Sequence, residues 1–212
     1  AFNISTAAAL VTAAAGVPVA KHGNRRVSSS TGSADVLTAL GVNVQAELAL
    51  VEHCLDELGV CFCFAPLAHP AMRHVAEVRR KLGVPTIFNL VGPLANPASA
   101  PFQLLGTTSL ELRDKLAEAL ALLGTSRAAV LTSDVGLDEV APTGATHVRL
   151  VGDESRTLTW HPADFGLEPS PLESLVVDDA EASAALIRSV LAGDSSPARD
   201  VVVMNAAAAL WT

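Results

Sequence analysis

The stretch that decides the fold runs from residue 17 to residue 40 and reads VPVAKHGNRRVSSSTGSADVLTAL. Its first residues, 17–20, favour a short buried strand, and residues 34–40 have the composition of a helix that Gly41 would close. A polar loop with a cluster of cations and hydroxyls lies between them. A strand, a loop and a helix in this order are the unit of an α/β fold, in which ligands bind where strands end and helices begin.

The same alternation continues along the rest of the chain. Strands are predicted at 60–64, 103–106 and 128–131, and a hairpin at 146–151 and 157–160. Helices are predicted at 5–15, 47–58, 70–82, 110–123, 180–191 and from about 198 onward, whereas residues 86–101, rich in proline and glycine, should be irregular. This order predicts one domain over residues 1–212, a three-layer α/β/α domain with a mainly parallel central sheet.

Composition excludes several classes of function. Half of the 212 residues are hydrophobic, 17% are charged and the formal net charge is −8, which is typical of a folded protein and not of a disordered chain. Binding to nucleic acid usually needs a broad basic face, so no nucleic acid is expected as a partner. The apolar runs are too short and too interrupted for a membrane span, and three cysteines form no disulfide framework, so a cytoplasmic location is expected.

The polar loop of residues 21–33 gathers cations around a glycine. Lys21 and Arg25 supply positive charge, and Gly23 lets backbone amides approach an anion, which suits a small polyanion. A solvated loop whose serines only cap the next helix fits the composition equally well. His22 could be a proton carrier or a hydrogen-bonded loop residue.

Two further features could carry chemistry. Asp138 and Glu139 stand side by side just beyond the strand predicted at 128–131, where they could hold Mg²⁺ together with substrate phosphates, although most adjacent acidic pairs are exposed turns. Arg79 falls on an apolar stripe of the helix predicted at 70–82. There it either lies over the edge of the core or binds a carboxylate in a cleft.

A zinc site is the less favoured interpretation of the cysteines. Cys61 and Cys63 share one face of a predicted strand, with His69 and His74 nearby in sequence. Their spacing matches no recognised ligand pattern, and phenylalanines surround them, so core cysteines are expected.

Six motifs in a fixed order resemble one family. They are NIST at 3–6, KHGNR at 21–25, the serine run to Ser33, FAPLAHPAMRHVAEVRRKLG at 64–83, TIFNLVGPLANP at 86–97 and LDEVAPTG at 137–144. Over essentially its whole length the chain resembles the anthranilate phosphoribosyltransferases, which belong to the nucleoside phosphorylase and phosphoribosyltransferase fold class. The resemblance implies that, with Mg²⁺, the amine of anthranilate displaces pyrophosphate from C1 of 5-phosphoribosyl 1-diphosphate (PRPP), a step of tryptophan biosynthesis.

The resemblance also implies roles for individual residues. Asn3, Ser5 and Thr6 would contact PRPP, and Ser5 would also ligate magnesium. The phosphate-binding loop would include Lys21, His22, Gly23, Asn24, Arg25, Ser28, Ser29 and Ser33. Asn24 and Arg79 would hold anthranilate, and Asp138 and Glu139 would bind magnesium. Because the reaction mainly needs charge stabilisation at the leaving pyrophosphate and positioning of a neutral amine, no strong base is required, and His22 is the only acid–base candidate.

The chain also departs from the family. The glycine-rich GTGGD turn, which contacts the diphosphate, would lie before residue 1, and Ala1 stands where a threonine is usual. The resemblance also implies an amino-terminal helical domain, which would supply the dimer interface and one wall of the anthranilate site, and a last strand and helix, none of which we expect within residues 1–212. Arg26 and Ala68 replace a usual small and a usual aromatic residue. We therefore expect a homodimer for the parent enzyme and little or no activity for residues 1–212 alone.

Two alternatives stay open at this point. A relative of the pyrimidine nucleoside phosphorylases would need phosphate as the nucleophile and a pocket that reads a pyrimidine, and Asn24 with Arg79 argues against it. A non-catalytic relative that binds nucleic acid would show a basic groove and would have lost the acidic pair. The net charge of −8 and the intact Asp138 and Glu139 count against this second alternative.

Overall fold

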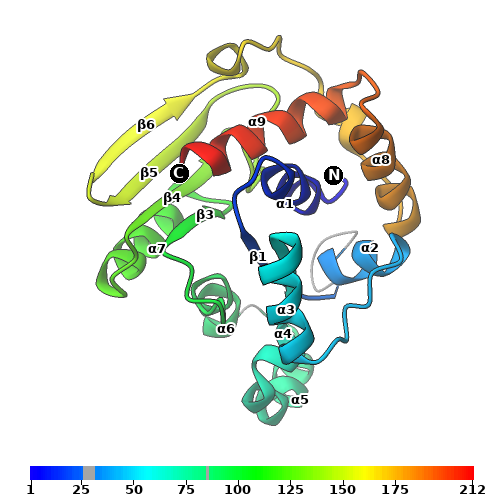
Figure 1. Cartoon of the computed structure of the whole chain (residues 1–212). Helices are drawn as coiled ribbons and strands as arrows, with labels where there is room; N and C mark the ends of the chain where they lie inside the picture. Colours follow the sequence, from blue (N-terminus) through cyan, green and yellow to red (C-terminus); the bar gives the residue numbers. More distant parts are fainter. Residues whose placement is uncertain (26–31, 85) are drawn as a thin grey trace.

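A computed structural model describes residues 1–25, 32–84 and 86–212, and its strands form two sheets (Figure 1). In the first, β1 (Val19–Gly23) pairs in parallel with β2 (Val60–Phe64). The second has the order β3 (Phe102–Gly106), β4 (Arg127–Ser133), β5 (Thr146–Gly152) and β6 (Arg156–Trp160). β3 and β4 are parallel, whereas β5 is antiparallel to both β4 and β6.

Helices cover both faces of the four-stranded sheet. On one face α1 (Ile4–Ala14) packs along α9 (Pro197–Trp211), and on the other face lies α7 (Leu110–Leu122). The remaining helices are α2 (Ser33–Ala39), α3 (Leu48–Leu58), α4 (Ala65–Ala68), α5 (Arg73–Leu82), α6 (Ile87–Val91) and α8 (Ala180–Ala192). Short 3₁₀ turns span Pro70–Met72, Gly92–Leu94, Pro162–Phe165 and Leu172–Leu175.

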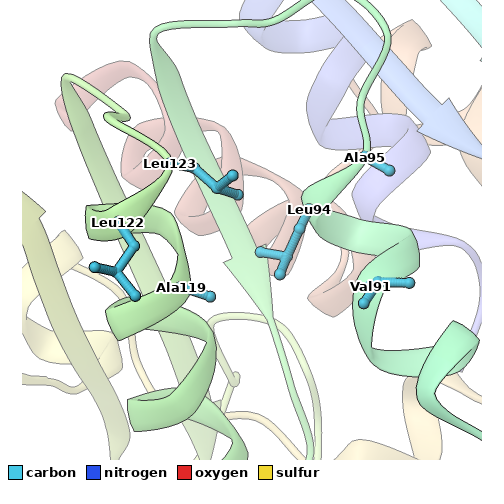
Figure 2. Close-up of a pocket in the computed structure, with 6 residues that line it drawn as sticks. All are labelled: Val91, Leu94, Ala95, Ala119, Leu122 and Leu123. Carbon is cyan, nitrogen blue, oxygen red and sulfur yellow. The ribbon is translucent and has the colours of Figure 1, made fainter.

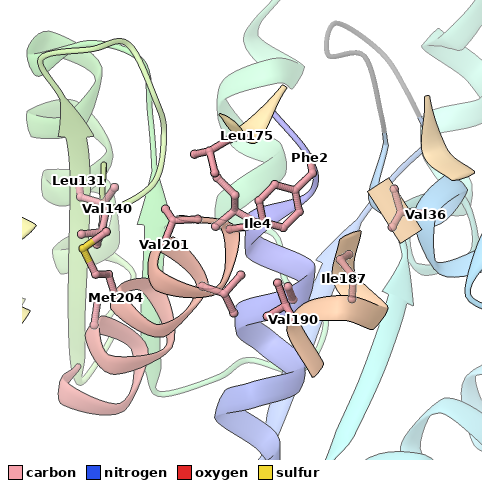
Figure 3. Packing of buried hydrophobic residues seen from close by; sticks show 14 of the residues in the cluster. Phe2, Ile4, Val36, Leu131, Val140, Leu175, Ile187, Val190, Val201 and Met204 are labelled. Atoms are coloured by element: carbon pink, nitrogen blue, oxygen red, sulfur yellow. The ribbon is translucent and has the colours of Figure 1, made fainter. Parts of the chain in front are cut away.

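Strand β4 shows why the layers form. Its side chains alternate between the two faces of the sheet, as in any strand. Ala129 and Leu131 enter the large core with α1, α8 and α9, whereas Ala128 and Val130 pack against α7. Figure 3 shows the large core, in which Ile4 of α1 lies among side chains from α8 and α9. The predicted α/β/α class is confirmed.

The structure differs from two of the local predictions, the end of β1 and the irregularity of residues 86–101. β1 runs to Gly23 instead of ending at residue 20, because parallel pairing with β2 brings His22 opposite Cys63 and Gly23 opposite Phe64. The segment 86–101 is less irregular than its composition predicts. It contains α6, whose first turn is fixed by a capping box in which the side chains of Thr86 and Asn89 satisfy each other's backbone amides.

The sheet itself differs in detail from one mainly parallel sheet. Among the described residues the strands divide into a parallel pair and a mixed sheet, and neither β1 nor β3 has a strand on its second edge. A cavity of about 890 Å³ lies between these two strands. In the described part of the chain, no helix combines the length and apolar character that crossing a membrane requires.

Candidate active site

The cavity between β1 and β3 brings together several of the polar residues that the sequence singled out. Its polar wall comes from α1, the end of β1, the loop after α6 and the loop after β4. The residues with polar side chains there include Ser5, Lys21, His22, Asn24, Asn96, Asp138 and Glu139. Residues far apart in the sequence thus place a cation, hydroxyl and amide groups and two carboxylates around one space.

Lys21 is the cation of this site. Its ammonium donates a hydrogen bond to the hydroxyl of Ser5 at 3.0 Å, which connects β1 to the first turn of α1. Surrounding protein atoms lower the pKa of Lys21 to about 8 by removing water, and the charges of Glu139 and Asp138 oppose this shift. Lys21 and the two carboxylates therefore line the same cavity, close enough for their charges to affect one another.

The carboxylate pair has the electrostatics of a cation site. Removal from water raises the pKa of Glu139 to about 8, and the charge and hydrogen bond of its neighbour Asp138 raise it further, against the opposing effect of Lys21. Both groups offer the hard oxygen ligands that Mg²⁺ prefers. No cluster of three or more His, Cys, Asp or Glu side chains that could hold a metal occurs among the described residues. Mg²⁺ fits here if phosphate, hydroxyl or water oxygens complete its ligands.

A glycine allows the acidic loop to lie where it does. Gly106 ends β3, and a Cβ atom built on it would overlap the backbone carbonyl of Asp138. Two side chains also hold the loop, Ser133 at the end of β4 and Asn205 on α9. No local sequence pattern marks these three residues, so they could not be predicted as part of the site. They matter only through contacts made across the fold.

His22 lies beside His69, a residue that the sequence had suggested only as a possible zinc ligand. The rings of His22 and His69 meet edge to face with centroids 5.0 Å apart. Partial burial and the neighbouring His69 lower the pKa of His22, opposed by a hydrogen bond to the backbone of Gly92. The lowered pKa favours the neutral form of His22.

Asn96, which was also not predicted, donates a hydrogen bond to the carbonyl of Ala20 at 2.9 Å. This bond fixes the loop after α6 against β1.

The start of the phosphate-binding loop is partly defined. Gly23 allows close approach, because an added Cβ would overlap the Ser33 hydroxyl and crowd Phe62. The carbonyl of Asn24 accepts from the backbone of Ala34 and from the Ser33 hydroxyl, so the loop end is joined to α2. Ser28 and Ser29, together with Arg26, lie outside the described residues, and their roles stay predictions.

Arg25 lies outside the cavity wall. It forms an ion pair with Asp35 at 3.0 Å, and its guanidinium lies over the ring of Phe64.

Two residues of the first motif support the helix start. The side chain of Asn3 accepts from the backbone of Thr6 at 3.1 Å and caps α1, and the Asn3 amide donates to Ser183. Thr6 is 1% exposed, and neither residue lies in the cavity wall. Of the NIST motif, Ser5 is the residue whose side chain reaches the site.

Arg79 also lies outside the cavity wall. Its guanidinium donates to the side-chain oxygen of Asn89 at 3.3 Å and lies 5.4 Å from the ring centroid of Phe88. The structure therefore joins α5 to α6 through Arg79 and does not bring Arg79 together with Asn24. Its part in binding anthranilate stays a prediction.

Two other features carry no site chemistry. Cys61 and Cys63 are buried with their sulfur atoms 4.0 Å apart, which fits core cysteines. A second hollow of about 450 Å³ separates the segment around α6 from α7 (Figure 2). Only apolar side chains line it: Val91, Leu94, Ala95, Ala119, Leu122 and Leu123.

Comparison with known proteins finds relatives that match along nearly the whole chain. A curated protein of Rhodospirillum rubrum named anthranilate phosphoribosyltransferase is 56% identical over 210 residues, which are 99% of this chain. The crystal structure of anthranilate phosphoribosyltransferase from Thermus thermophilus matches with a TM-score of 0.92 and 46% identity, over 99% of this chain and 63% of that one. The Saccharomyces cerevisiae enzyme in complex with PRPP and Mg matches with a TM-score of 0.90 and 33% identity, over 98% and 59%.

The matches differ in how much of each relative they cover. The chain spans about 60% of the length of the R. rubrum protein. The sequence model described as "Glycosyl transferase family, a/b domain", by contrast, matches residues 1–212, the whole of this sequence. The chain therefore belongs to this glycosyl transferase family and supplies its a/b domain.

Proposed function

We propose that the full-length protein transfers the 5-phosphoribosyl group of PRPP to the amine of anthranilate. In this reaction the bond between C1 of the ribose and the pyrophosphate oxygen breaks, a bond from the amine nitrogen to C1 forms, and the amine loses a proton. The products are N-(5-phosphoribosyl)anthranilate and pyrophosphate. The relatives that carry the name anthranilate phosphoribosyltransferase support this assignment.

The observation that carries the proposal is that Lys21, Asp138 and Glu139 line one cavity. A departing pyrophosphate accumulates negative charge, and a preorganised cation and a metal site are the groups that stabilise it. Mg²⁺ would neutralise phosphate charge when it is held by the two carboxylates. The Ser5 hydroxyl, which is hydrogen-bonded to Lys21, would bind either the metal or a phosphate oxygen.

The neutral aromatic substrate needs a different surface. Part of the cavity wall is apolar, including Ala65 and Pro93, and these residues lie with His22 in the same wall. An aromatic ring can pack against such a surface. We propose that anthranilate binds here with Asn24 at one side. The carboxylate of anthranilate would pair with Arg79 when α5 and α6 contact the bound substrate. A neutral His22 could accept the amine proton, although the reaction does not require a strong base.

Location and assembly follow from the same assignment. A biosynthetic enzyme with this substrate is proposed to act in the cytoplasm, with no nucleic acid or membrane as a partner. The full-length protein is proposed to be a homodimer through parts of the chain beyond these 212 residues.

The test is turnover by the full-length protein. With PRPP, Mg²⁺ and anthranilate, pyrophosphate release and anthranilate consumption should be equal in amount, and both should stop when Mg²⁺ is chelated. Asp138→Asn with Glu139→Gln should abolish both while Lys115→Met, on the exposed side of α7, should leave them unchanged. Phosphorolysis of thymidine without anthranilate turnover would instead identify a pyrimidine nucleoside phosphorylase.

A further inference from the structure

The residue after the acidic pair is held by a side chain from a distant helix. Asn205 of α9 accepts a hydrogen bond from the Val140 amide at 2.9 Å and donates to the Val140 carbonyl at 3.0 Å. Its second donor bonds to the carbonyl of Val201 on its own helix at 2.8 Å. Asn205 is 3% exposed and lies in the wall of the cavity. One buried amide therefore fixes both backbone polar groups of Val140.

The residue before the pair is held in the same manner from β4. The Ser133 hydroxyl donates to the carbonyl of Leu137 and accepts from its amide, both at 2.9 Å. The Ser133 amide also donates to this carbonyl at 3.1 Å. Asp138 and Glu139 thus stand between two neighbours whose backbones are both anchored by side chains.

This arrangement answers an electrostatic need. When both are ionised, as metal binding requires, two adjacent carboxylates repel each other, and a free loop would turn them apart into solvent. Anchoring the backbone on both sides keeps them together in the cavity without a bound cation. Neither Ser133 nor Asn205 needs to ligate a metal to have this effect.

We propose that Asn205 and Ser133 are positioning residues that hold Asp138 and Glu139 in the conformation that binds Mg²⁺. This inference rests on the proposed function, because it takes the acidic pair as the metal site. It makes α9 part of the metal site although α9 supplies no ligand. Substitution of either residue weakens Mg²⁺ binding more than it weakens the fold.

The test measures metal binding and not turnover. Calorimetric titration of the full-length protein with PRPP, at a series of Mg²⁺ concentrations and without anthranilate, gives the Mg²⁺ concentration for half-maximal binding. Asn205→Leu removes all three hydrogen bonds at similar volume. Ser133→Ala removes one hydroxyl and decides the question if Asn205→Leu does not fold. Val202→Ala, at a fully buried position of the same helix, is the control for lost stability.

The expected result is a rise of about 10- to 100-fold in the required Mg²⁺ concentration for Asn205→Leu, and a smaller rise for Ser133→Ala. Val202→Ala should stay within about two-fold of the wild type, with thermal unfolding in metal-free buffer lowered as much as in Asn205→Leu. Equal Mg²⁺ requirements in all variants would overturn the inference while leaving the proposed function intact. A wild type that binds PRPP without needing Mg²⁺ would overturn the metal role on which both rest.

Discussion

Lys21 is the single residue on which the charge balance of the cavity depends most. It donates to Ser5 and lies in the wall of the cavity in which the polyanion is proposed to bind, within the electrostatic influence of both carboxylates. Lys21→Met keeps the length of the side chain and removes the charge. Loss of a hydrogen bond to a charged group costs about 1.5–3 kcal/mol, so kcat/KM for PRPP should fall roughly 10- to 150-fold.

Steady-state kinetics with varied PRPP would measure this loss. Lys115→Met is the matched control, because Lys115 forms an exposed ion pair with Glu111 on α7, away from the cavity. An unchanged kcat/KM in Lys21→Met would contradict a phosphate-binding role for Lys21.

Arg79 allows a prediction that separates the two substrates. In the structure its guanidinium bonds to Asn89 and lies over Phe88, so it is oriented by α6. If it binds the anthranilate carboxylate, Arg79→Ala should raise KM for anthranilate by about ten-fold or more, since a bidentate charged contact is lost, and should leave KM for PRPP nearly unchanged. The exposed Arg73→Ala, at the start of α5, is the control. Equal effects on both substrates would indicate that Arg79 only joins α5 to α6.

At the scale of elements, the end of β3 determines where the acidic loop can lie. The Gly106 position has no space for a side chain, because a Cβ there would overlap the Asp138 carbonyl. We expect Gly106→Ala to displace the loop and to remove the stabilisation that Mg²⁺ with PRPP gives to the wild type. That stabilisation is about 2.7 kcal/mol at a ligand concentration of 100 Kd. Thermal unfolding of the full-length protein with and without the ligands would measure it, and a full ligand-induced rise in Tm in Gly106→Ala would show that the loop tolerates the change.

Local sequence patterns predicted most elements but not the contacts between them. The run VCFCF at 60–64 became β2 with the predicted bounds, and the hairpin of β5 and β6 followed from its polar turn. The extension of β1 to Gly23 depended on pairing with β2, which no window around residue 20 can reveal. Contacts in the candidate site were likewise not visible in local sequence patterns. Lys21, Asp138 and Glu139 were recognisable from residue type and motif, whereas Asn205 matters only because α9 passes the loop after β4.

At the scale of the whole molecule, the described residues include strand edges and apolar surfaces of a kind that usually contact a partner. β1 and β3 each keep one edge without a strand among the described residues, and unpaired edges favour association. Large apolar side chains are also exposed on neighbouring helices, with Leu82 of α5 at 56% and Ile87 of α6 at 62%. Where such side chains gather into one surface, they mark an interface with another part of the chain or with another molecule.

These surfaces lead to a prediction about residues 1–212 expressed alone. The expected turnover of anthranilate is very weak or absent, because the cavity that holds Lys21 and the acidic pair is bounded by the two unpaired strand edges. The same polypeptide should self-associate through the exposed apolar side chains of α5 and α6, which light scattering during size-exclusion chromatography would detect. The full-length protein, measured in parallel, should form one defined oligomer and turn over PRPP. Substantial turnover by a monomeric 1–212 polypeptide would show that the cavity is complete without any further segment.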